Sequence, residues 1–357
     1  MLFDLHPKER REELFGRDEE VEYAVKQVLS GNWLIVGGQR EIGKTSLVKV
    51  VLNELRKNGL KGVYVNLRGV KGLNGLLNAL LSQLNSMKVS ISFKLNFVVG
   101  SAGIELRKGA KPVSSLTELL DSLEGFVIAL DEIQELSSAS RQLLEVLGNV
   151  FSTNPRVSFI FTGSHFGVIK TLLEPPSSSP LHGRPPATLT LKPFDEETSR
   201  EFLRRGMEEL NVEFEREGEV IRELDGVVGW LTLFGNLYAV RGLSFETALK
   251  ETINQGKEIM AEEFSHFLEG RVNKALYAEI MEALKIMSRW KDIKRAVELS
   301  LGNVDDKTFS EALHKLVNAG FVEEREGVYV IADPVLRRVE FRRLTKGSRA
   351  NTSADPV

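Results

Sequence analysis

Short apolar runs alternate with amphipathic segments through the first half of the 357-residue chain. Each run is four to eight residues long, which is typical of strands buried on both faces of a sheet. Between the runs, apolar residues recur every three or four positions, a spacing that predicts helices. Strands that alternate with helices indicate a parallel sheet, so we predict an α/β fold built on five parallel strands. The predicted strands lie at residues 33–36, 62–67, 125–132, 157–164 and 187–191.

Residues 87–108 interrupt this rhythm, because apolar and polar side chains alternate from Val89 to Phe97. A period of two predicts strands, and Gly100–Gly103 would form the turn of a β-hairpin inserted into the sheet domain. The apolar face of this hairpin either packs on the body of the domain or binds a partner.

The second half of the chain is patterned differently. Residues 194–270 show helical spacing only, which predicts a helical lid domain. Residues 271–344 carry three helical segments and then two short apolar strands around Glu326 and Gly327, a tight two-residue turn. Three helices followed by a hairpin predict a winged-helix domain. The polar segment 345–357 is predicted to be a disordered tail.

Composition narrows the class of protein. The chain has no cysteine, so disulfides and thiolate zinc sites are excluded. Its net charge of −3 argues against a surface that is basic everywhere, so any contact with nucleic acid would be local. No apolar run approaches the roughly 18 residues that a membrane-spanning helix needs, and the N-terminus lacks a signal-like apolar region. We therefore expect a cytoplasmic protein with no membrane contact.

The strongest chemical motif lies between the first predicted strand and a helix that begins at Lys44. Gly38, Gly43, Lys44 and Thr45 match G-x-x-x-x-G-K-[ST], the phosphate-binding loop or Walker A motif. In such a loop, backbone N–H groups and the lysine bind phosphates, and the threonine hydroxyl binds Mg²⁺. This makes residues 1–193 a nucleotide-binding domain for ATP or ADP with Mg²⁺. The predicted loop residues are Gly38, Gln39, Arg40, Glu41, Ile42, Gly43, Lys44, Thr45 and Ser46.

Two carboxylates at the end of the run 125–132 form the second motif, a Walker B pattern. Ligands of parallel sheets bind at the carboxyl ends of the strands. We therefore expect Asp131 to hold Mg²⁺ beside Thr45, and Glu132 to act as the general base that activates water. Lys44 supplies the positive charge that faces the β- and γ-phosphates, so we also count it as a catalytic residue.

Two further residues are candidates near the same edge of the sheet. Ser164, with Thr162, ends the run 157–164 and would sense the γ-phosphate side, or would simply form a Thr-Gly-Ser turn. Arg184 lies in the proline- and serine-rich stretch 175–186 and would act as a charge-stabilising arginine finger, or would be only solvated.

Several segments occur in an order that resembles the archaeal ATPase family, a member of the STAND branch of AAA-type P-loop ATPases. They are GGQREIGKTSL, DEIQ, FTGS, PLHGR and DGVVGWL. The resemblance runs from Leu14 to Arg338. The resemblance implies that the protein binds Mg-ATP and consists of a nucleotide-binding domain, a helical lid and a C-terminal winged helix. It also implies that Phe15, Gly16 and Arg17 lie near the adenine. Where relatives have a glycine-any-proline turn in the lid, this chain has Gly226 to Val228, so we expect a looser lid.

Two functions follow from these motifs. The leading hypothesis is a Mg-ATP-dependent ATPase whose nucleotide state switches the arrangement of lid and winged helix. The alternative is a scaffold or DNA-binding regulator that holds ADP with little turnover. Acidic residues in the predicted wing, Glu323, Glu324 and Glu326, oppose DNA phosphates. We therefore expect a protein partner or intramolecular docking through the winged helix, with weak or no DNA binding, and the oligomeric state stays open.

Overall fold

The computed structural model describes residues 1–87, 97–100, 103–106, 109, 111–163, 169, 181–183 and 185–345. Of the predictions above, Ser164, Arg184, the alternating stretch 89–96 and the tail from residue 346 lie outside the described residues.

The five predicted strands form one parallel sheet. Their order is β2-β5-β6-β1-β7, so the first strand of the chain lies near the middle of the sheet. The register sets Val36 beside Thr162 and Asn66 beside Asp131. The carboxyl ends of β1, β5 and β6 therefore meet at one edge. The strands are β1 (Leu34–Gly37), β2 (Lys61–Asn66), β5 (Phe126–Asp131), β6 (Val157–Thr162) and β7 (Ala187–Thr190).

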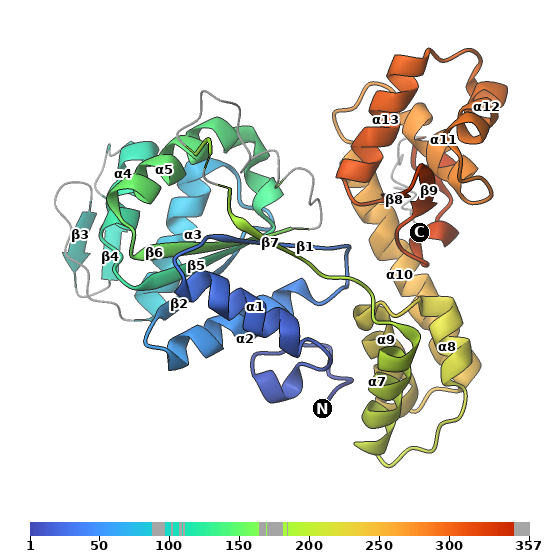
Figure 1. Ribbon diagram of the computed structural model, residues 1–357, viewed down its shortest axis with the longest axis horizontal. Coiled ribbons are helices and arrows are strands. Elements are labelled where there is room, and N and C mark those ends of the chain that lie inside the picture. The colour runs from blue at the N-terminus through green and yellow to red at the C-terminus, as the bar shows by residue number, and fades with distance from the viewer. Residues whose placement is uncertain are drawn as a thin grey trace, which may run out of the picture.

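Helices cover both faces of this sheet (Figure 1). One face is covered by α1 (Asp18–Leu29) and α2 (Lys44–Lys57), which pack on side chains such as Leu34 and Val36. The opposite face carries a second apolar core with Trp33 and Ile35. The helices of that face are α3 (Gly72–Ser86), α4 (Pro112–Asp121) and α5 (Ser140–Thr153), and a 3₁₀ helix covers Ile133–Ala139. Because successive side chains of a strand point to opposite faces, β1 contributes side chains to both cores.

The inserted hairpin is present between α3 and α4. Its strands β3 (Phe97–Gly100) and β4 (Gly103–Leu106) are antiparallel, and Gly100 pairs with Gly103. Gly100 and Gly103, which begin and end the predicted turn, are therefore the last paired residues of the two strands.

The second half of the chain is helical until its last hairpin. The lid contains α7 (Glu196–Glu208), α8 (Glu217–Leu224), α9 (Val228–Gly235) and a short π-helix (Asn236–Val240). The long helix α10 (Phe245–Leu268) then runs from the lid to the winged helix (Figure 1). The winged helix consists of α11 (Lys274–Leu284), α12 (Trp290–Leu301), α13 (Asp306–Asn318), β8 (Val322–Arg325) and β9 (Val328–Ile331), followed by a 3₁₀ turn (Leu336–Arg338) and α14 (Phe341–Thr345).

One continuous hydrophobic cluster joins these C-terminal elements. It extends from Phe3 near the start of the chain through Trp230 in the lid and Phe264 on α10 to Phe341 in α14. Lid, α10 and winged helix therefore share buried contacts, and α10 mechanically connects them. Within the described ranges, no helix combines the length and the apolarity that crossing a bilayer requires.

Candidate functional site

The loop between β1 and α2 has the curl that a phosphate-binding loop needs. Gly38 and Gly43 adopt φ values of 138° and 92°, which side-chain-bearing residues rarely adopt. A Cβ on Gly38 would also lie 2.8 Å from the carbonyl oxygen of Leu191. Glycine at that position is therefore required by both conformation and space.

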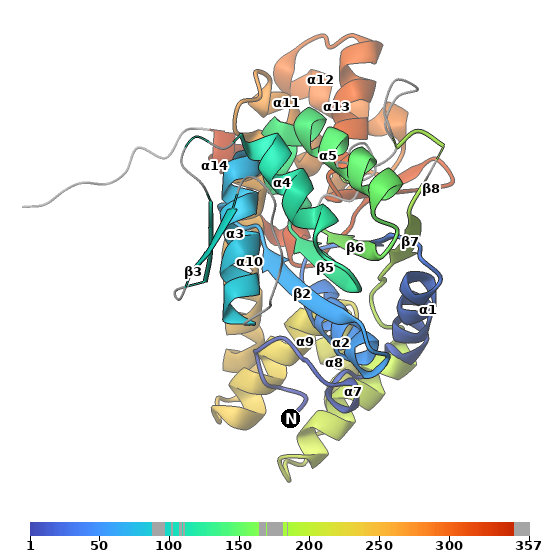
Figure 2. The same cartoon turned by 90° about the vertical axis from the view of Figure 1, so that its left-hand side faces the viewer.

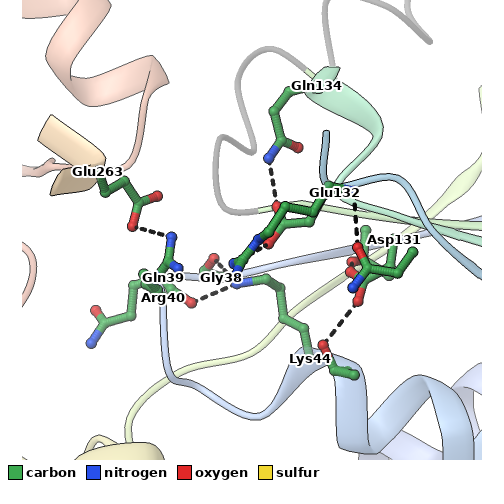
Figure 3. A network of polar contacts seen from close by, with 12 residues as sticks. Gly38, Gln39, Arg40, Lys44, Asp131, Glu132, Gln134 and Glu263 are labelled. Atoms are coloured by element: carbon green, nitrogen blue, oxygen red, sulfur yellow. Dashed lines mark hydrogen bonds and ion pairs between the residues drawn. The ribbon is translucent and has the colours of Figure 1, made fainter. Parts of the chain in front are cut away.

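Lys44 begins α2 and is buried. Its Nζ donates to the carbonyl oxygens of Gly38 at 2.9 Å and Gln39 at 2.6 Å, so the ammonium lies inside the curl of the loop (Figure 3). Burial lowers the pKa of Lys44, and nearby carboxylates, Glu132 first among them, oppose that shift. Phosphate oxygens entering the loop would replace neutral carbonyls by charged acceptors, which make stronger hydrogen bonds.

Asp131 ends β5 and is 4% exposed. Its carboxylate accepts hydrogen bonds from the hydroxyls of Thr45 at 2.9 Å, Tyr64 at 2.5 Å and Thr162. Burial, together with the charge of Asp131, raises the pKa of Tyr64, so the phenol stays protonated and donates. A carboxylate beside a threonine hydroxyl supplies the oxygen ligands that Mg²⁺ prefers. Asp131 and Thr45 could therefore hold the metal, and their role as its ligands stays a prediction.

Glu132 follows the strand in a left-handed conformation, with φ 60°. The side-chain amide of Gln134 donates to one carboxylate oxygen at 2.5 Å (Figure 3). The guanidinium of Arg68 lies 3.8 Å from the other oxygen. A Cβ on Gly163 would lie 2.2 Å from the amide oxygen of Gln134, so the glycine after β6 makes room for this amide. The Gln134 amide thus holds the candidate base, with the Arg68 guanidinium nearby, and the sequence analysis gave neither side chain this role.

These residues surround a cavity of about 460 Å³. Among the described residues of the loop that line the cavity, Arg40 has a buried donor, Nε, with no hydrogen-bond partner. An unpaired buried donor in the same cavity as a buried lysine fits an anionic ligand. The residues therefore fit a nucleotide with its metal. The predicted residues that line the cavity are Phe15, Arg17, Arg40, Glu41, Ile42, Gly43, Lys44, Thr45, Ser46, Asp131 and Glu132.

Gly16 and Arg17 have structural roles next to this cavity. A Cβ on Gly16 would lie 3.1 Å from the Thr198 methyl group. The Arg17 guanidinium donates to the carbonyl of Lys192 at 2.6 Å and lies over the Phe194 ring, 4.6 Å from its centroid. This clamp joins the start of α1 to the segment after β7, and the adenine contact of both residues stays a prediction.

The phosphate loop is also bonded to the lid and to α10. The N–H of Gly229, in α9, donates to the carbonyl of Glu41 at 2.8 Å. Arg40 forms an ion pair of 2.9 Å with Glu263 of α10, whose side chain is 7% exposed (Figure 3). Burial opposes the shift, but the Glu263 carboxylate raises the pKa of Arg40. Sequence reasoning missed Glu263, because it is 223 positions from Arg40 and lies on a helix rich in other acidic residues.

Comparison with known proteins gives matches over both halves of the chain. Residues 14–234 match an ATPase domain found predominantly in Archaea. Residues 272–332 match the C-terminal winged helix-turn-helix domain of MCM proteins. No curated protein matches the chain.

Solved structures resemble the whole chain. The Walker-type ATPase paby2304 of Pyrococcus abyssi is 30% identical, with 96% of this chain and 100% of that chain covered and a TM-score of 0.79. The ORC2 protein of Aeropyrum pernix, solved with ADPNP and ADP, is 17% identical, with 96% of each chain covered and a TM-score of 0.61. The Cdc6p protein of Pyrobaculum aerophilum is 16% identical, with 96% and 97% covered and a TM-score of 0.50. The last two show the fold alone.

Proposed function

The chain belongs to the family of ATPase domains found predominantly in Archaea, and from that premise we propose that it hydrolyses Mg-ATP and that the bound nucleotide switches the arrangement of lid and winged helix. Lys44 would neutralise the β- and γ-phosphates, with the backbone of the loop around them. Asp131 and Thr45 would hold Mg²⁺, which when bound neutralises developing charge on the phosphates. Glu132 would take a proton from the attacking water.

The observation that supports a switch is the double attachment of the phosphate loop. Glu41 accepts a hydrogen bond from the first turn of α9, and the next residue back, Arg40, pairs with Glu263 on α10. The Arg40 guanidinium pairs with Glu263, and in the ATP state the γ-phosphate would compete with that carboxylate for it. Because a ligand shifts an equilibrium only through differential affinity, a group that distinguishes ATP from ADP is required, and Arg40 can be that group.

A single-turnover assay tests the ATPase part of the proposal. The protein is purified, the nucleotide that copurifies is identified, and hydrolysis of substoichiometric ATP with Mg²⁺ is followed with and without candidate partners. Turnover supports an ATPase. Retained ADP with no turnover under any condition would instead favour the regulator that holds ADP.

A charge-neutral variant tests the switch. Glu263→Gln keeps the shape of the side chain but removes the anion that competes for Arg40. Glu262→Gln is the matched control, since Glu262 is the preceding residue of the same helix and is exposed. Small-angle scattering should differ between the Mg-ADP state and a non-hydrolysable ATP state for the parent and Glu262→Gln, and differ less for Glu263→Gln. Indistinguishable scattering of the two states in the parent would contradict the switch.

A further inference from the structure

The first residues of the chain are inserted into the lid. Phe3 is fully buried, and its ring occupies a slot between α7 and α9. A Cβ on Gly206 would lie 2.2 Å from the ring, and one on Gly235 would lie 2.3 Å from it. Real Cβ atoms do not approach that closely, so the slot exists only because both helices carry glycine there.

Side chains of the lid form hydrogen bonds with the backbone on both sides of the Phe3 ring. The Asn236 side-chain amide donates to the carbonyl of Phe3 at 3.0 Å. The N–H of Leu2 donates to the Glu209 carboxylate at 2.7 Å. Burial of a large aromatic side chain together with paired backbone groups makes this a specific attachment.

The other end of the segment is attached to the helix of the phosphate loop. The N–H of Lys8 donates to the hydroxyl of Ser46 at 3.1 Å. Glu9 pairs with Lys49 at 2.8 Å and accepts a hydrogen bond from the Asn53 amide at 2.5 Å through its carbonyl. The segment therefore extends from the lid to α2, beside α2 and α7 (Figure 2).

Between these two attachments, the segment lines the cavity of the phosphate loop. The residues of the segment that line it, together with Thr45 and Ser46, are Leu2, Asp4, Leu5, His6, Pro7 and Lys8. The Lys8 ammonium donates to the carbonyls of Met1 at 3.0 Å and Asp4 at 2.9 Å, which closes this stretch into a compact turn.

We propose that residues 2–9, the N-terminal strap, are part of the nucleotide-binding site and control nucleotide exchange. This inference rests on the proposed function of the cavity. The strap forms an outer wall on the side of Thr45 and Ser46. Because Phe3 fixes the strap to the lid and Glu9 fixes it to α2, the strap connects the lid to α2 and resists opening of the lid. Nucleotide leaves only when one of the two attachments detaches.

The glycine slot permits a test that leaves the strap itself unchanged. Gly206→Ala and Gly235→Ala fill the slot, and alanine is the better helix former, so loss of helix cannot explain an effect. Gly218→Ala is the matched control, because a Cβ there meets only the end of the Arg200 side chain at 4.0 Å. The measurement is dissociation of a fluorescent ADP analogue chased with unlabelled ADP. We expect Gly206→Ala, Gly235→Ala and Phe3→Ala to dissociate about tenfold faster or more, with Gly218→Ala equal to the parent.

A variant at the other attachment separates the strap from lid packing. Asn53→Ala removes a hydrogen bond to Glu9 and leaves the lid core intact, and it should also accelerate dissociation. Two results would overturn the strap proposal and leave the proposed nucleotide binding unaffected. One is faster dissociation in the slot variants but not in Asn53→Ala, and the other is dissociation within about twofold of the parent in all variants. Absence of binding by the parent would overturn the proposed function and the strap with it.

Discussion

The indole N–H of Trp230 donates to the buried carboxylate of Asp333 across 2.9 Å and so bonds the lid helix α9 to the segment that follows the wing. The same carboxylate accepts the backbone N–H groups of Val335 at 2.7 Å and Leu336 at 3.0 Å. Gly256 of α10 packs against this junction, where a Cβ would lie 2.8 Å from Val335 and 3.4 Å from the indole. If α9 moves relative to the winged helix, this hydrogen bond therefore has to break, or the segment around Asp333 has to move with α9.

This bond predicts a pH-dependent effect of Trp230→Phe. Burial raises the pKa of Asp333 to about 6, and the indole N–H and two backbone N–H groups partly oppose that shift. A folded-state pKa above the unfolded value of 3.8 means that the group's contribution to stability is complete below that value and is lost as pH rises through about 6. Trp230→Phe removes a donor that favours the ionised form, so the pKa rises further. The loss of Tm should therefore be larger near pH 8 than near pH 5.

Trp290→Phe provides the control for this experiment. The Trp290 indole donates to the hydroxyl of Ser310 at 3.2 Å, a neutral acceptor. The loss of Tm caused by Trp290→Phe should be the same near pH 5 and near pH 8. An equal loss at both values for Trp230→Phe would mean that the indole does not influence the ionisation of Asp333.

Glu132→Gln should retain nucleotide binding and lose hydrolysis by roughly 100-fold or more, since the amide keeps the shape but cannot accept the proton from water. Single-turnover hydrolysis and nucleotide affinity are the two measurements. Glu135→Gln is the charge-matched control, because Glu135 lies in the 3₁₀ helix that follows Glu132 and is outside the cavity. Hydrolysis by Glu132→Gln at the parent rate would show that another group is the base.

Lys44→Ala should abolish measurable nucleotide binding, because Lys44 is the cation at the centre of the phosphate loop. Its ammonium also holds the carbonyls of Gly38 and Gln39, so circular dichroism must show that the variant is folded. Affinity for ADP and ATP is measured by calorimetry. Binding within about tenfold of the parent would contradict the assigned role.

The sequence predicted those parts of the site that depend on local patterns. Apolar runs located the strands, and parallel strands ending together brought Thr45 and Asp131 to one edge. Glu263 and Phe3 were missed for a common reason. Their surroundings come from residues more than 200 positions away in the chain, and no period or motif encodes such pairs. The domain boundaries and the roles of the site residues stay predictions.

We predict weak, salt-sensitive DNA binding by the winged helix. Three of the basic residues in the described part of the C-terminal segment each pair with a carboxylate: Arg338 with Glu223, Arg342 with Glu279 at 2.7 Å and Arg343 with Glu340 at 2.6 Å. In the wing, Arg325 pairs with Glu323 at 2.5 Å, which leaves Glu324 and Glu326 to face a phosphate backbone. Unpaired cations supply most DNA affinity, so little is expected.

Fluorescence anisotropy on labelled duplexes at two salt concentrations measures this affinity. Reversing the wing charge with Glu324→Lys and Glu326→Lys should strengthen binding and steepen its salt dependence. Sub-micromolar, sequence-selective binding by the parent at physiological salt would contradict the prediction.

Val228→Pro should tighten nucleotide retention. Val228 is the first residue of α9, a position where proline is favoured, and Val227 before it is extended at φ −72° and ψ 104°, as a residue preceding proline must be. The Val228 side chain lies 3.4 Å from where a Cβ on Gly43 would be, so this turn touches the phosphate loop. Restricting the unfolded chain there should stabilise the lid by about 0.4–1 kcal/mol.

The readout is Trp230 itself, since this residue is among those that line the cavity and its indole donates to Asp333. In a background with Trp33→Phe and Trp290→Phe, its emission on adding Mg-ADP or Mg-ATP reports the junction with Asp333. Val228→Ala, which removes the side chain without fixing φ, separates lost contact from backbone restriction. We expect slower nucleotide dissociation for Val228→Pro than for the parent, with Val228→Ala equal or faster. If apo, ADP and ATP states give identical emission in the parent background, the nucleotide does not move the lid against the winged helix, because a change in α9 would have to alter the hydrogen bond that this indole donates.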